Sequence, residues 1–372
     1  MKLLLIVNDE TTIYNFRREI LRAFHANGYD VTLCIPEGSH TKEIEACGCN
    51  IVNIKVQRHG TNPIQDLKFL KTCLKQINAN QPDIVLTYTV KPNIYGSIAA
   101  QIKRVPYINN ITGLGTVLQS DSALARLMLS LQKFAYKRSS CVFFQNESNY
   151  KALLDKGVVR KETPVEILPG SGVNLELHFF VPMMPDDGVV KFVIVSRIRK
   201  DKGYNEFFDA ARAVKEKYPN TEFHVIGWYE EEFYKKRIDD LVNEGVIVYH
   251  GKKVQEEVHN IVASCDCSVL PSYHEGMANV LLEAAATGRP VIASRIPGCQ
   301  ETFDEGITGY GCDVKSAESL RVAMEKMVLT PYEKRVEMGR LGRKKMEKEF
   351  DRSFVADKYI KYIERIAGRK EK

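Results

Sequence analysis

The stretch PSYHEGMANVLLE, residues 271–283, contains two glutamates that are separated by seven residues. The preceding CSVL, residues 267–270, has the pattern of a buried strand. The run 280–287 is rich in Leu and Ala and is followed by Gly and Pro, which commonly end helices. These patterns predict that Glu275 lies in a strand-to-helix loop and that Glu283 lies inside the following helix.

A strand-to-helix loop suits an anion, because its free backbone N–H groups and the helix N-terminus can face the ligand. A carboxylate on each side of the anion can accept hydrogen bonds from hydroxyl groups. A phosphate flanked by hydroxyl groups describes a nucleotide-sugar. Glutamates at this spacing also occur by chance on solvated helix surfaces, so the pair by itself leaves the function open.

A second loop upstream strengthens this interpretation. The segment VIVSRIRKDKG, residues 193–203, predicts a strand that ends at Ser196, followed by four positive charges before a helix begins near Tyr204. Open α/β sheets bind ligands at such strand ends. Arg197 and Lys202 would neutralise a diphosphate there, although an ordinary basic loop has the same composition.

Length and composition indicate a large intracellular globular protein. The 372 residues suffice for two domains of roughly 150–200 residues each, and 44% hydrophobic with 27% charged residues is typical of a globular chain. No apolar run approaches the ~20 residues of a transmembrane helix. The first apolar stretch, residues 3–7, is too short for a secretory signal. Nine cysteines without a CxxC pair favour a reducing cytoplasm over disulfide or zinc frameworks.

The positive charge is confined to the N-terminal half. Residues 1–182 contain 21 Lys and Arg against 15 Asp and Glu, whereas residues 183–372 contain 32 of each. The chain has no nucleic-acid-binding motif, so we expect no nucleic acid partner. A membrane surface or a pyrophosphate-bearing substrate fits a basic half better.

Strand and helix patterns alternate along the whole chain, which predicts parallel sheets covered by helices on both faces. A Pro-, Gly- and Asp-containing linker at 180–188 separates two such halves. We therefore expect one domain at 1–182 and a second at 183–350, followed by a C-terminal helix at 351–372; the resemblance described next implies that the first domain binds the acceptor, that the second binds the nucleotide-sugar, and that the last helix packs back on the first domain. One uninterrupted helix is predicted over Ile13–Asn27.

Together these motifs resemble the family 4 retaining glycosyltransferases of the GT-B fold, nearly from end to end. The resemblance is carried by the Glu-x7-Glu pair, by SR-x4-KG at 196–203 and by GSGVN at 170–174. In the N-terminal half, YNFR at 14–17, KPN at 91–93 and NITGLG at 110–115 resemble bacterial members that extend lipid-diphosphate-linked oligosaccharides. The implied fold is α/β, with two Rossmann-like doubly wound domains facing a cleft.

The resemblance implies roles for the donor residues. Arg197 and Lys202 would grip the diphosphate and stabilise the departing UDP, Glu275 would hold the donor sugar, and Glu283 would bind the ribose hydroxyls. The implied donor-binding residues are Gly276, Met277, Ala278, Asn279, Val280, Glu283, Gly251 and Val254. The segment from Gly251 to Val254 would bind the edge of the uracil. The chain contains no DxD motif, so no metal and no cofactor are expected besides the UDP-sugar substrate.

The acceptor is expected on the basic N-terminal half. Arg17, Lys91 and Asn93 would bind the lipid diphosphate, although an exposed surface group is the commoner explanation for each. Thr112 stands where relatives carry a His or Glu near the reacting centre, which puts a side-chain base in doubt. The segment 123–138 is apolar with only positive charges, as in an interfacial helix or an ordinary packed helix with a basic rim.

These features predict a cytoplasmic enzyme, peripheral to the inner membrane, that builds capsule, O-antigen or related glycans. It would move a hexose or N-acetylhexosamine from a UDP-sugar to a polyprenyl-diphosphate-linked saccharide, with retention of configuration. The alternatives are a UDP-sugar 2-epimerase of the same fold, a glycogen-synthase-like polymerase and a non-catalytic scaffold. The histidines at 178, 224, 250 and 259 have no metal-ligand spacing and are interpreted as structural.

Overall fold

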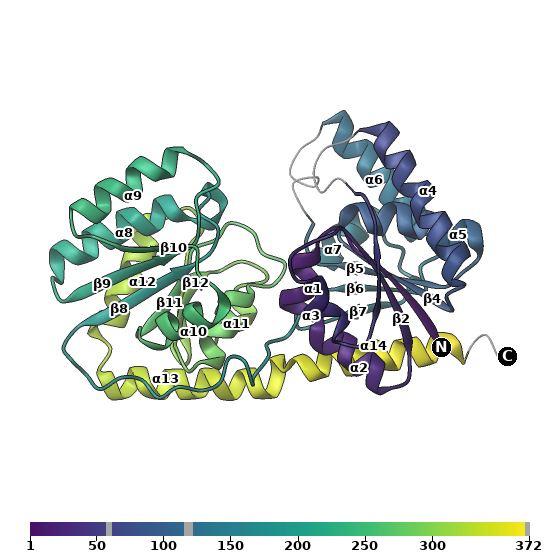
Figure 1. Cartoon of the computed structure of the whole chain (residues 1–372). Coiled ribbons are helices and arrows are strands. Elements are labelled where there is room, and N and C mark those ends of the chain that lie inside the picture. The colour runs from purple at the N-terminus through teal and green to yellow at the C-terminus, as the bar shows by residue number, and fades with distance from the viewer. Residues whose placement is uncertain (57–61, 115–121, 369–372) are drawn as a thin grey trace. The chain divides into compact units, whose positions relative to one another are not determined.

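The structure is a computed structural model, and it describes residues 1–56, 62–114 and 122–368. The chain divides into two compact units, each built on its own sheet (Figure 1). Unit 1 comprises Met1–Gly172 together with the chain from Arg352 onward, and unit 2 comprises Val173–Asp351. The prediction of two doubly wound α/β domains is confirmed.

Unit 1 contains a seven-stranded, all-parallel sheet in the order β3-β2-β1-β4-β5-β6-β7. Its central strands β4 and β5 are buried along their whole length, since helices cover both faces of the sheet. The order of the strands reverses between β1 and β4. The strands are β1 (Lys2–Ile6), β2 (Asp30–Ile35), β3 (Asn50–Asn53), β4 (Ile84–Tyr88), β5 (Tyr107–Ile111), β6 (Cys141–Phe144) and β7 (Val165–Ile167).

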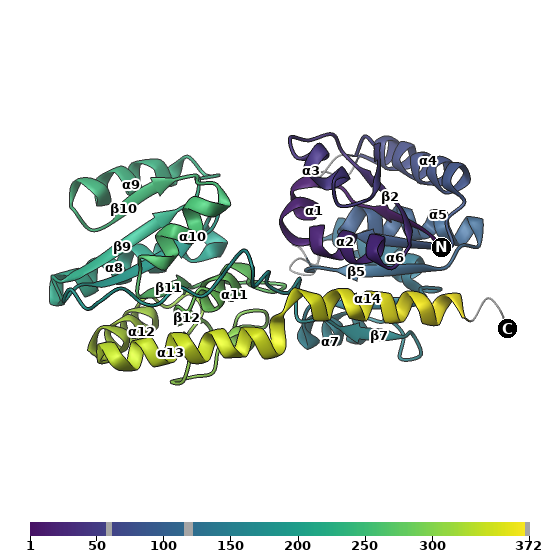
Figure 2. The same cartoon turned by 60° about the horizontal axis from the view of Figure 1, so that its bottom comes forward.

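Helices of unit 1 pack on both faces of this sheet. Figure 2 shows α2 and α14 side by side along one face, where Tyr359 of α14 contacts Phe24 of α2 edge to face. On the other face, α4 starts with Asn62, whose side chain accepts from two backbone N–H groups of the first turn. The helices are α1 (Glu10–Phe16), α2 (Arg18–Ala26), α3 (Thr41–Glu45), α4 (Pro63–Asn80), α5 (Ser97–Lys103), α6 (Ala123–Tyr136), α7 (Glu147–Asp155) and α14 (Arg352–Ala367).

Unit 2 contains a six-stranded parallel sheet in the order β10-β9-β8-β11-β12-β13. The order reverses between β8 and β11, so these two strands lie side by side. The strands are β8 (Val190–Val195), β9 (Thr221–Ile226), β10 (Val248–Gly251), β11 (Cys267–Leu270), β12 (Val291–Ser294) and β13 (Gly309–Cys312).

Two separate cores hold the helices of unit 2 to its sheet. The larger core is formed with α8, α9 and α12, and the smaller one with α10 and α11 (Figure 1). The helices are α8 (Tyr204–Lys217), α9 (Phe233–Asn243), α10 (Gln255–Ala263), α11 (Asn279–Ala286), α12 (Ala317–Leu329) and α13 (Tyr332–Lys345).

The boundary between the units lies after Gly172, ten residues before the predicted boundary after Pro182. The intervening segment is bound to unit 2 by its backbone, since the Val181 N–H donates to the Thr287 carbonyl at 3.1 Å. Residues from Arg352 onward belong to unit 1, where the Arg352 guanidinium lies 2.8 Å from a carboxylate oxygen of Glu19.

Two predicted details of secondary structure were wrong. The helix expected over Ile13–Asn27 is interrupted at Arg17, whose φ of −134° is not helical and separates α1 from α2. Strand β13 was not predicted, because its sequence GYGC has the glycine content of a loop. No helix within the described residues combines the length and apolarity needed to cross a membrane.

Candidate functional site

The two loops singled out from the sequence are joined to each other at the point where the sheet order of unit 2 reverses. The loop after β8 leads through a 3-10 turn, Lys200–Lys202, into α8, and the loop after β11 leads into α11. The carbonyl of Asp201 accepts from the Tyr273 N–H at 2.8 Å and from the Ser272 hydroxyl at 3.1 Å. In doubly wound sheets this reversal is the usual ligand crevice.

A glycine allows the two loops to approach. Gly203 has a φ of +76°, and a Cβ at this position would lie 2.1 Å from the carbonyl oxygen of Pro271. Any side chain would therefore both strain the backbone and separate the loops.

This junction brings Lys202 and Glu275 together. The ammonium of Lys202 donates to a carboxylate oxygen of Glu275 at 2.5 Å. Their side chains are only 15% and 14% exposed, so the pair is largely shielded from solvent. Two residues predicted from separate motifs thus form one ion pair at the end of the sheet.

Arg197 lies on the same loop but has a different partner. Its guanidinium donates to one carboxylate oxygen of Glu230 at 3.1 Å, and Arg199 donates to the other at 3.3 Å. Glu230 follows β9, and the sequence analysis did not select it. Its only sequence signal is its place in an acidic run, EEE at 230–232.

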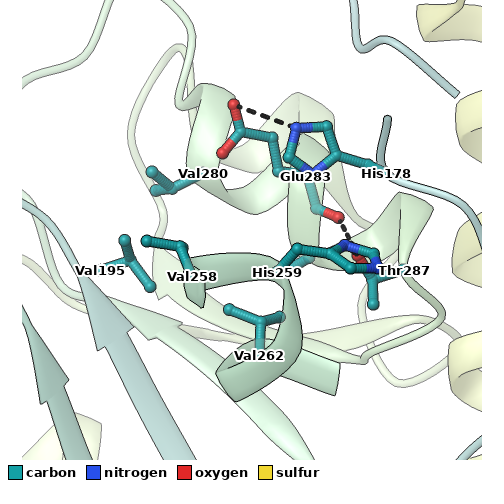
Figure 3. A pocket seen from close by; sticks show the side chains of 9 residues that line it. His178, Val195, Val258, His259, Val262, Val280, Glu283 and Thr287 are labelled. Carbon is teal, nitrogen blue, oxygen red and sulfur yellow. Dashed lines mark hydrogen bonds and ion pairs between the residues drawn. The ribbon is translucent and has the colours of Figure 1, made fainter. Parts of the chain in front are cut away.

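Glu283 lies in the second turn of α11 and borders a hollow of about 250 Å³, counted with its open mouth. Figure 3 shows its carboxylate turned toward the imidazole of His178, with the Nε2 to Oε1 distance 3.8 Å. The sequence analysis treated His178 as structural and did not connect it with Glu283. The hollow is lined by His178, Val195, Val258, His259, Val262, Val280, Glu283, Ala284 and Thr287.

The floor of this hollow contains a second imidazole. The Nδ1 of His259 lies 3.3 Å from the hydroxyl of Thr287 (Figure 3), and its Nε2 has no hydrogen-bond partner within the described chain. Burial lowers the pKa of His259, and the nearby guanidinium of Arg289 lowers it further. His259 is therefore a neutral group at neutral pH.

The start of α11 carries the remaining donor residues that were expected. The N–H of Ala278 donates to the Gly298 carbonyl at 2.7 Å, which fixes the chain as it enters the helix. Asn279 is the first helical residue, and its side-chain Oδ1 is buried without a partner within the described residues. Met277 and Ala278 are buried.

The segment expected to bind uracil lies at the end of β10. Gly251 adopts a φ of +68°, and its carbonyl accepts from the Gly227 N–H at 2.9 Å. Val254 is exposed and immediately precedes α10. The ammonium of Lys252 lies 5.3 Å from the ring centroid of Trp228, the single tryptophan of the chain.

In unit 1 the three residues expected to bind the acceptor's diphosphate are buried. Arg17 is 2% exposed and its guanidinium lies over the ring of Tyr88 at 5.4 Å. The Lys91 ammonium is paired with Asp66 at 2.8 Å. Asn93 accepts from the hydroxyl of Thr87 at 2.7 Å and also donates within the interior. The alternative interpretation of exposed surface groups was wrong, because all three residues are buried and have internal partners or ring contacts.

Two of the acceptor candidates do line one cavity. Asn93 and Thr112 border a hollow of about 280 Å³ at the ends of β4 and β5, together with Gln132 and Tyr136 of α6. Sequence analysis missed Gln132, because nothing in the sequence distinguishes it from the other polar residues of this largely apolar helix, Arg126, Ser130 and Lys133. Gly115, the last residue of the NITGLG motif, lies outside the described residues.

Across the part of the chain that the structure describes, no group of three or more His, Cys, Asp or Glu side chains is arranged to hold a metal ion. The cysteines of the chain are all buried thiols.

Two protein-family models match the chain, one in each unit. The model of glycosyl transferases group 1 matches residues 184–345, and the glycosyl transferase 4-like model matches residues 2–146. The resemblance predicted from the motifs is confirmed.

Individual relatives cover nearly the whole chain. A Campylobacter jejuni N,N'-diacetylbacillosaminyl-diphospho-undecaprenol alpha-1,3-N-acetylgalactosaminyltransferase is 26% identical over 95% of this chain and 96% of its own length. An Escherichia coli UDP-Gal:alpha-D-GlcNAc-diphosphoundecaprenol alpha-1,3-galactosyltransferase is 27% identical over 69% of each chain. The Anabaena protein HepE, solved in complex with UDP and glucose, has a TM-score of 0.77 at 17% identity, covering 98% of this chain and 99% of HepE.

Proposed function

Because the chain belongs to the GT-B glycosyltransferases of family 4, we propose that it transfers a hexose or N-acetylhexosamine from a UDP-sugar to a saccharide linked to a polyprenyl diphosphate. The two relatives described above are named for undecaprenyl-diphosphate-linked acceptors, and the E. coli enzyme is named for a UDP-sugar donor. Neither of them is an epimerase, which favours transfer over the 2-epimerase alternative.

The observation that carries the proposal is the ion pair of Lys202 and Glu275 at the reversal of the unit 2 sheet. An incoming diphosphate can replace Glu275 as the partner of Lys202, and the carboxylate that is released can accept from sugar hydroxyls. Arg197 lies on the same loop as Lys202 and adds a second cation for the diphosphate. The N-terminus of α11 adds the positive end of its helix dipole.

The proposed transfer forms a bond from the acceptor hydroxyl oxygen to the anomeric carbon and breaks the bond from that carbon to the UDP oxygen. The departing phosphate keeps the electron pair of the broken bond and takes the proton of the acceptor hydroxyl on the same face, so configuration is retained. Lys202 and Arg197 stabilise the negative charge that grows on the diphosphate. These fixed cations can do the electrostatic work that a metal ion does in other transferases, so we propose that the reaction is metal-independent.

The acceptor is proposed to bind unit 1. The hollow beside Asn93 and Thr112 offers polar groups for a saccharide hydroxyl. Helix α6 carries only positive charges, and its Leu124 and Leu127 are 47% and 57% exposed. An exposed apolar and cationic helix suits the surface of an anionic membrane, where a lipid-linked acceptor resides. We therefore propose a peripheral location on the cytoplasmic face.

A calorimetric titration with UDP, with and without EDTA, tests the proposal first. Binding that is unaffected by EDTA, followed by turnover of one UDP-sugar with a polyprenyl-diphosphate-linked saccharide, is the expected result. NMR of the product anomeric proton tests retention of configuration. A protein that binds no UDP would refute the donor assignment, and interconversion of a UDP-sugar without any acceptor would establish the epimerase instead.

A further inference from the structure

We infer that unit 1 contains a second ligand site, a cationic hollow between β7 and α14 that binds the phosphate group of a small anion. The hollow measures about 410 Å³, counted with its open mouth, and is larger than those beside Glu283 and Asn93. It is lined by Glu166, Lys358, Lys361, Tyr362 and Arg365. None of these residues belongs to the proposed donor or acceptor sites, so the inference goes beyond the proposed function and does not depend on it.

The residues that α14 contributes to this hollow form one stripe along the helix. They stand at positions i, i+3, i+4 and i+7, which share one face of an α-helix. The edge strand of the sheet, β7, lies beside this helix (Figure 2) and contributes Glu166. Glu166 is in register with Phe143 of β6, whose ring contacts Tyr362 edge to face at 5.2 Å. The packing of α14 on the sheet therefore fixes the wall of the hollow.

The single carboxylate that lines the hollow already has two partners. The ammonium of Lys358 lies 2.6 Å from one oxygen of Glu166, and the hydroxyl of Tyr362 donates to the other oxygen at 3.0 Å. Lys358 also donates to the carbonyl of Ile167 at 2.9 Å. Both carboxylate oxygens are thus engaged by Lys358 and Tyr362.

The two remaining cations of the hollow have no carboxylate partner. Lys361 and Arg365 are exposed and lie one helical turn apart, and neither forms an ion pair within the described residues. The guanidinium of Arg365 lies 5.9 Å from the ring centroid of Tyr362. Like charges at this spacing on a helix repel each other, which costs stability. The buried side of α14 holds the helix to the sheet without them, so the fold itself does not require this excess of positive charge.

A phosphate dianion matches the charge and the donors of the hollow. Three cations against one carboxylate leave the lining with a net charge of +2. A guanidinium binds phosphate oxygens through two parallel N–H groups, and an ammonium adds a compact positive charge. Because charged groups and one phenol make up the lining, the hollow offers no apolar wall to a hydrophobic ligand.

The position of the hollow favours a soluble ligand over a lipid headgroup. Phe143 points to the face of the unit 1 sheet that α14 covers. Its neighbours Val142 and Phe144 point to the other face, where they pack in one cluster with Ala135 of α6. The helix that we propose to contact the membrane therefore covers the opposite face of the sheet. We expect the ligand to be a phosphate ester or a diphosphate in solution.

Equilibrium dialysis of the full chain with radiolabelled pyrophosphate, which serves as the probe, tests the inference. The wild type should bind pyrophosphate at two sites, the hollow and the proposed donor site in unit 2. Lys361→Gln and Arg365→Gln should each weaken the site in the hollow by about 3- to 10-fold, and the double variant Lys361→Gln/Arg365→Gln should lose it. Lys202→Met should weaken only the site in unit 2. Lys71→Gln, which removes an exposed lysine of α4, is the matched control and should change neither site.

Glu166→Gln gives a readout that a purely structural role would not produce. It removes the negative charge that competes with the phosphate for the cations, so it should tighten the binding of pyrophosphate in the hollow by about fivefold. If Glu166 served only to hold β7 to α14, its replacement would lower Tm without tightening the ligand.

Unchanged pyrophosphate binding in Lys361→Gln/Arg365→Gln would overturn the inference. An equal loss in Lys71→Gln would overturn it as well, since it would indicate a general effect of positive charge. A wild type with one site, which the double variant loses and Lys202→Met keeps, would support the inference and refute the proposed donor site.

Co-sedimentation with phosphatidylcholine vesicles, with and without phosphatidic acid, distinguishes the sources of the phosphate. For a soluble ligand, the double variant should bind these vesicles as the wild type does. If the wild type binds no pyrophosphate and the double variant loses binding to vesicles with phosphatidic acid, the hollow binds a lipid headgroup and the expectation of a soluble ligand is wrong.

Discussion

Replacing Lys202 should weaken UDP binding, whereas replacing Glu275, its partner in the ion pair, should leave UDP binding unchanged or strengthen it. The two side chains contact each other at 2.5 Å in a largely buried position, so UDP must exchange one partner of Lys202 for another. Lys202→Met keeps the length of the side chain and removes the charge that would bind the diphosphate. Glu275→Gln keeps the shape of the carboxylate and removes the charge that competes for Lys202.

The size of the change in UDP affinity can be estimated from the exchange of partners at Lys202. A hydrogen bond to a charged group contributes about 1.5–3 kcal/mol net, and the variant Lys202→Met loses this contact with the diphosphate. Part of the loss is offset, because the wild-type protein must first separate Lys202 from Glu275. We expect a net weakening of about 1–2 kcal/mol, or roughly 5- to 30-fold in the Kd of UDP. Glu275→Gln should bind UDP as tightly as wild type or up to about fivefold more tightly.

The rate of sugar transfer gives a second test of the variant Glu275→Gln. If Glu275 holds the donor sugar, Glu275→Gln loses charged hydrogen bonds to its hydroxyl groups, which predicts a fall of about 10- to 100-fold in kcat/KM for the UDP-sugar. Calorimetry with UDP and a steady-state assay with the UDP-sugar measure the two effects. Lys200→Met is the matched control, because it removes an exposed lysine from the same 3-10 turn and should change neither quantity.

A parallel loss of UDP affinity in both variants would contradict this reasoning. It would mean that Glu275 supports the loop that binds UDP and does not compete with the diphosphate for Lys202. Equal behaviour of Lys200→Met and Lys202→Met would contradict it as well, since it would indicate a general effect of positive charge near the site.

Three further predictions concern the framework around the sites. Gly203→Ala should lower the free energy of unfolding of unit 2 by more than about 1 kcal/mol, because the position has a positive φ and a Cβ there would meet the backbone of the neighbouring loop. Urea unfolding followed by tryptophan fluorescence measures this loss of stability. Lys91→Met should lower the free energy of unfolding of unit 1 by about 1–3 kcal/mol, since it removes the ammonium that neutralises the largely buried carboxylate of Asp66, and the Kd of UDP should stay within about twofold. Unit 2 should lose stability as the pH falls below about 6.5, because burial lowers the pKa of His259, so that the unfolded chain binds a proton there before the folded protein does. The contribution of neutral His259 to the free energy of unfolding is present above the pKa of the unfolded chain and is lost as the pH falls through the lower pKa of the folded protein. His259→Leu should therefore reduce the slope of Tm against pH. An unchanged slope would exclude His259 as a source of the pH dependence.

The fold could be predicted from the sequence because its strands are short apolar runs that alternate with longer helical patterns. Such alternation leaves few arrangements other than parallel sheets covered on both faces. Strand β13 was not predicted, because it needs glycine to pack closely against β12. A Cβ on Gly309 would lie 2.3 Å from the carbonyl of Val291, so the glycines that conceal the strand in the sequence are the residues that let it approach β12.

The candidate site was predictable where topology alone brings residues together. Lys202 and Glu275 are 73 residues apart, yet each follows a strand at the reversal of a doubly wound sheet, and that rule is sufficient to place them as neighbours. The partners of Glu283 and Lys91 could not be found in this way. His178 precedes the second sheet in a segment without regular structure, and Asp66 lies on a helix whose rotation about its axis no sequence pattern specified.

The two carboxylates that we propose to bind the donor share an arrangement that bears on how UDP would bind. Glu275 is paired with Lys202, and Glu283 faces His178, so each already has a partner within unit 2 before a nucleotide arrives. Binding of UDP would then be an exchange of partners at Lys202. An exchange returns less free energy than the neutralisation of an isolated buried charge, because the contact that forms replaces one that is lost. The diphosphate should therefore contribute less to the affinity for UDP than its charge suggests.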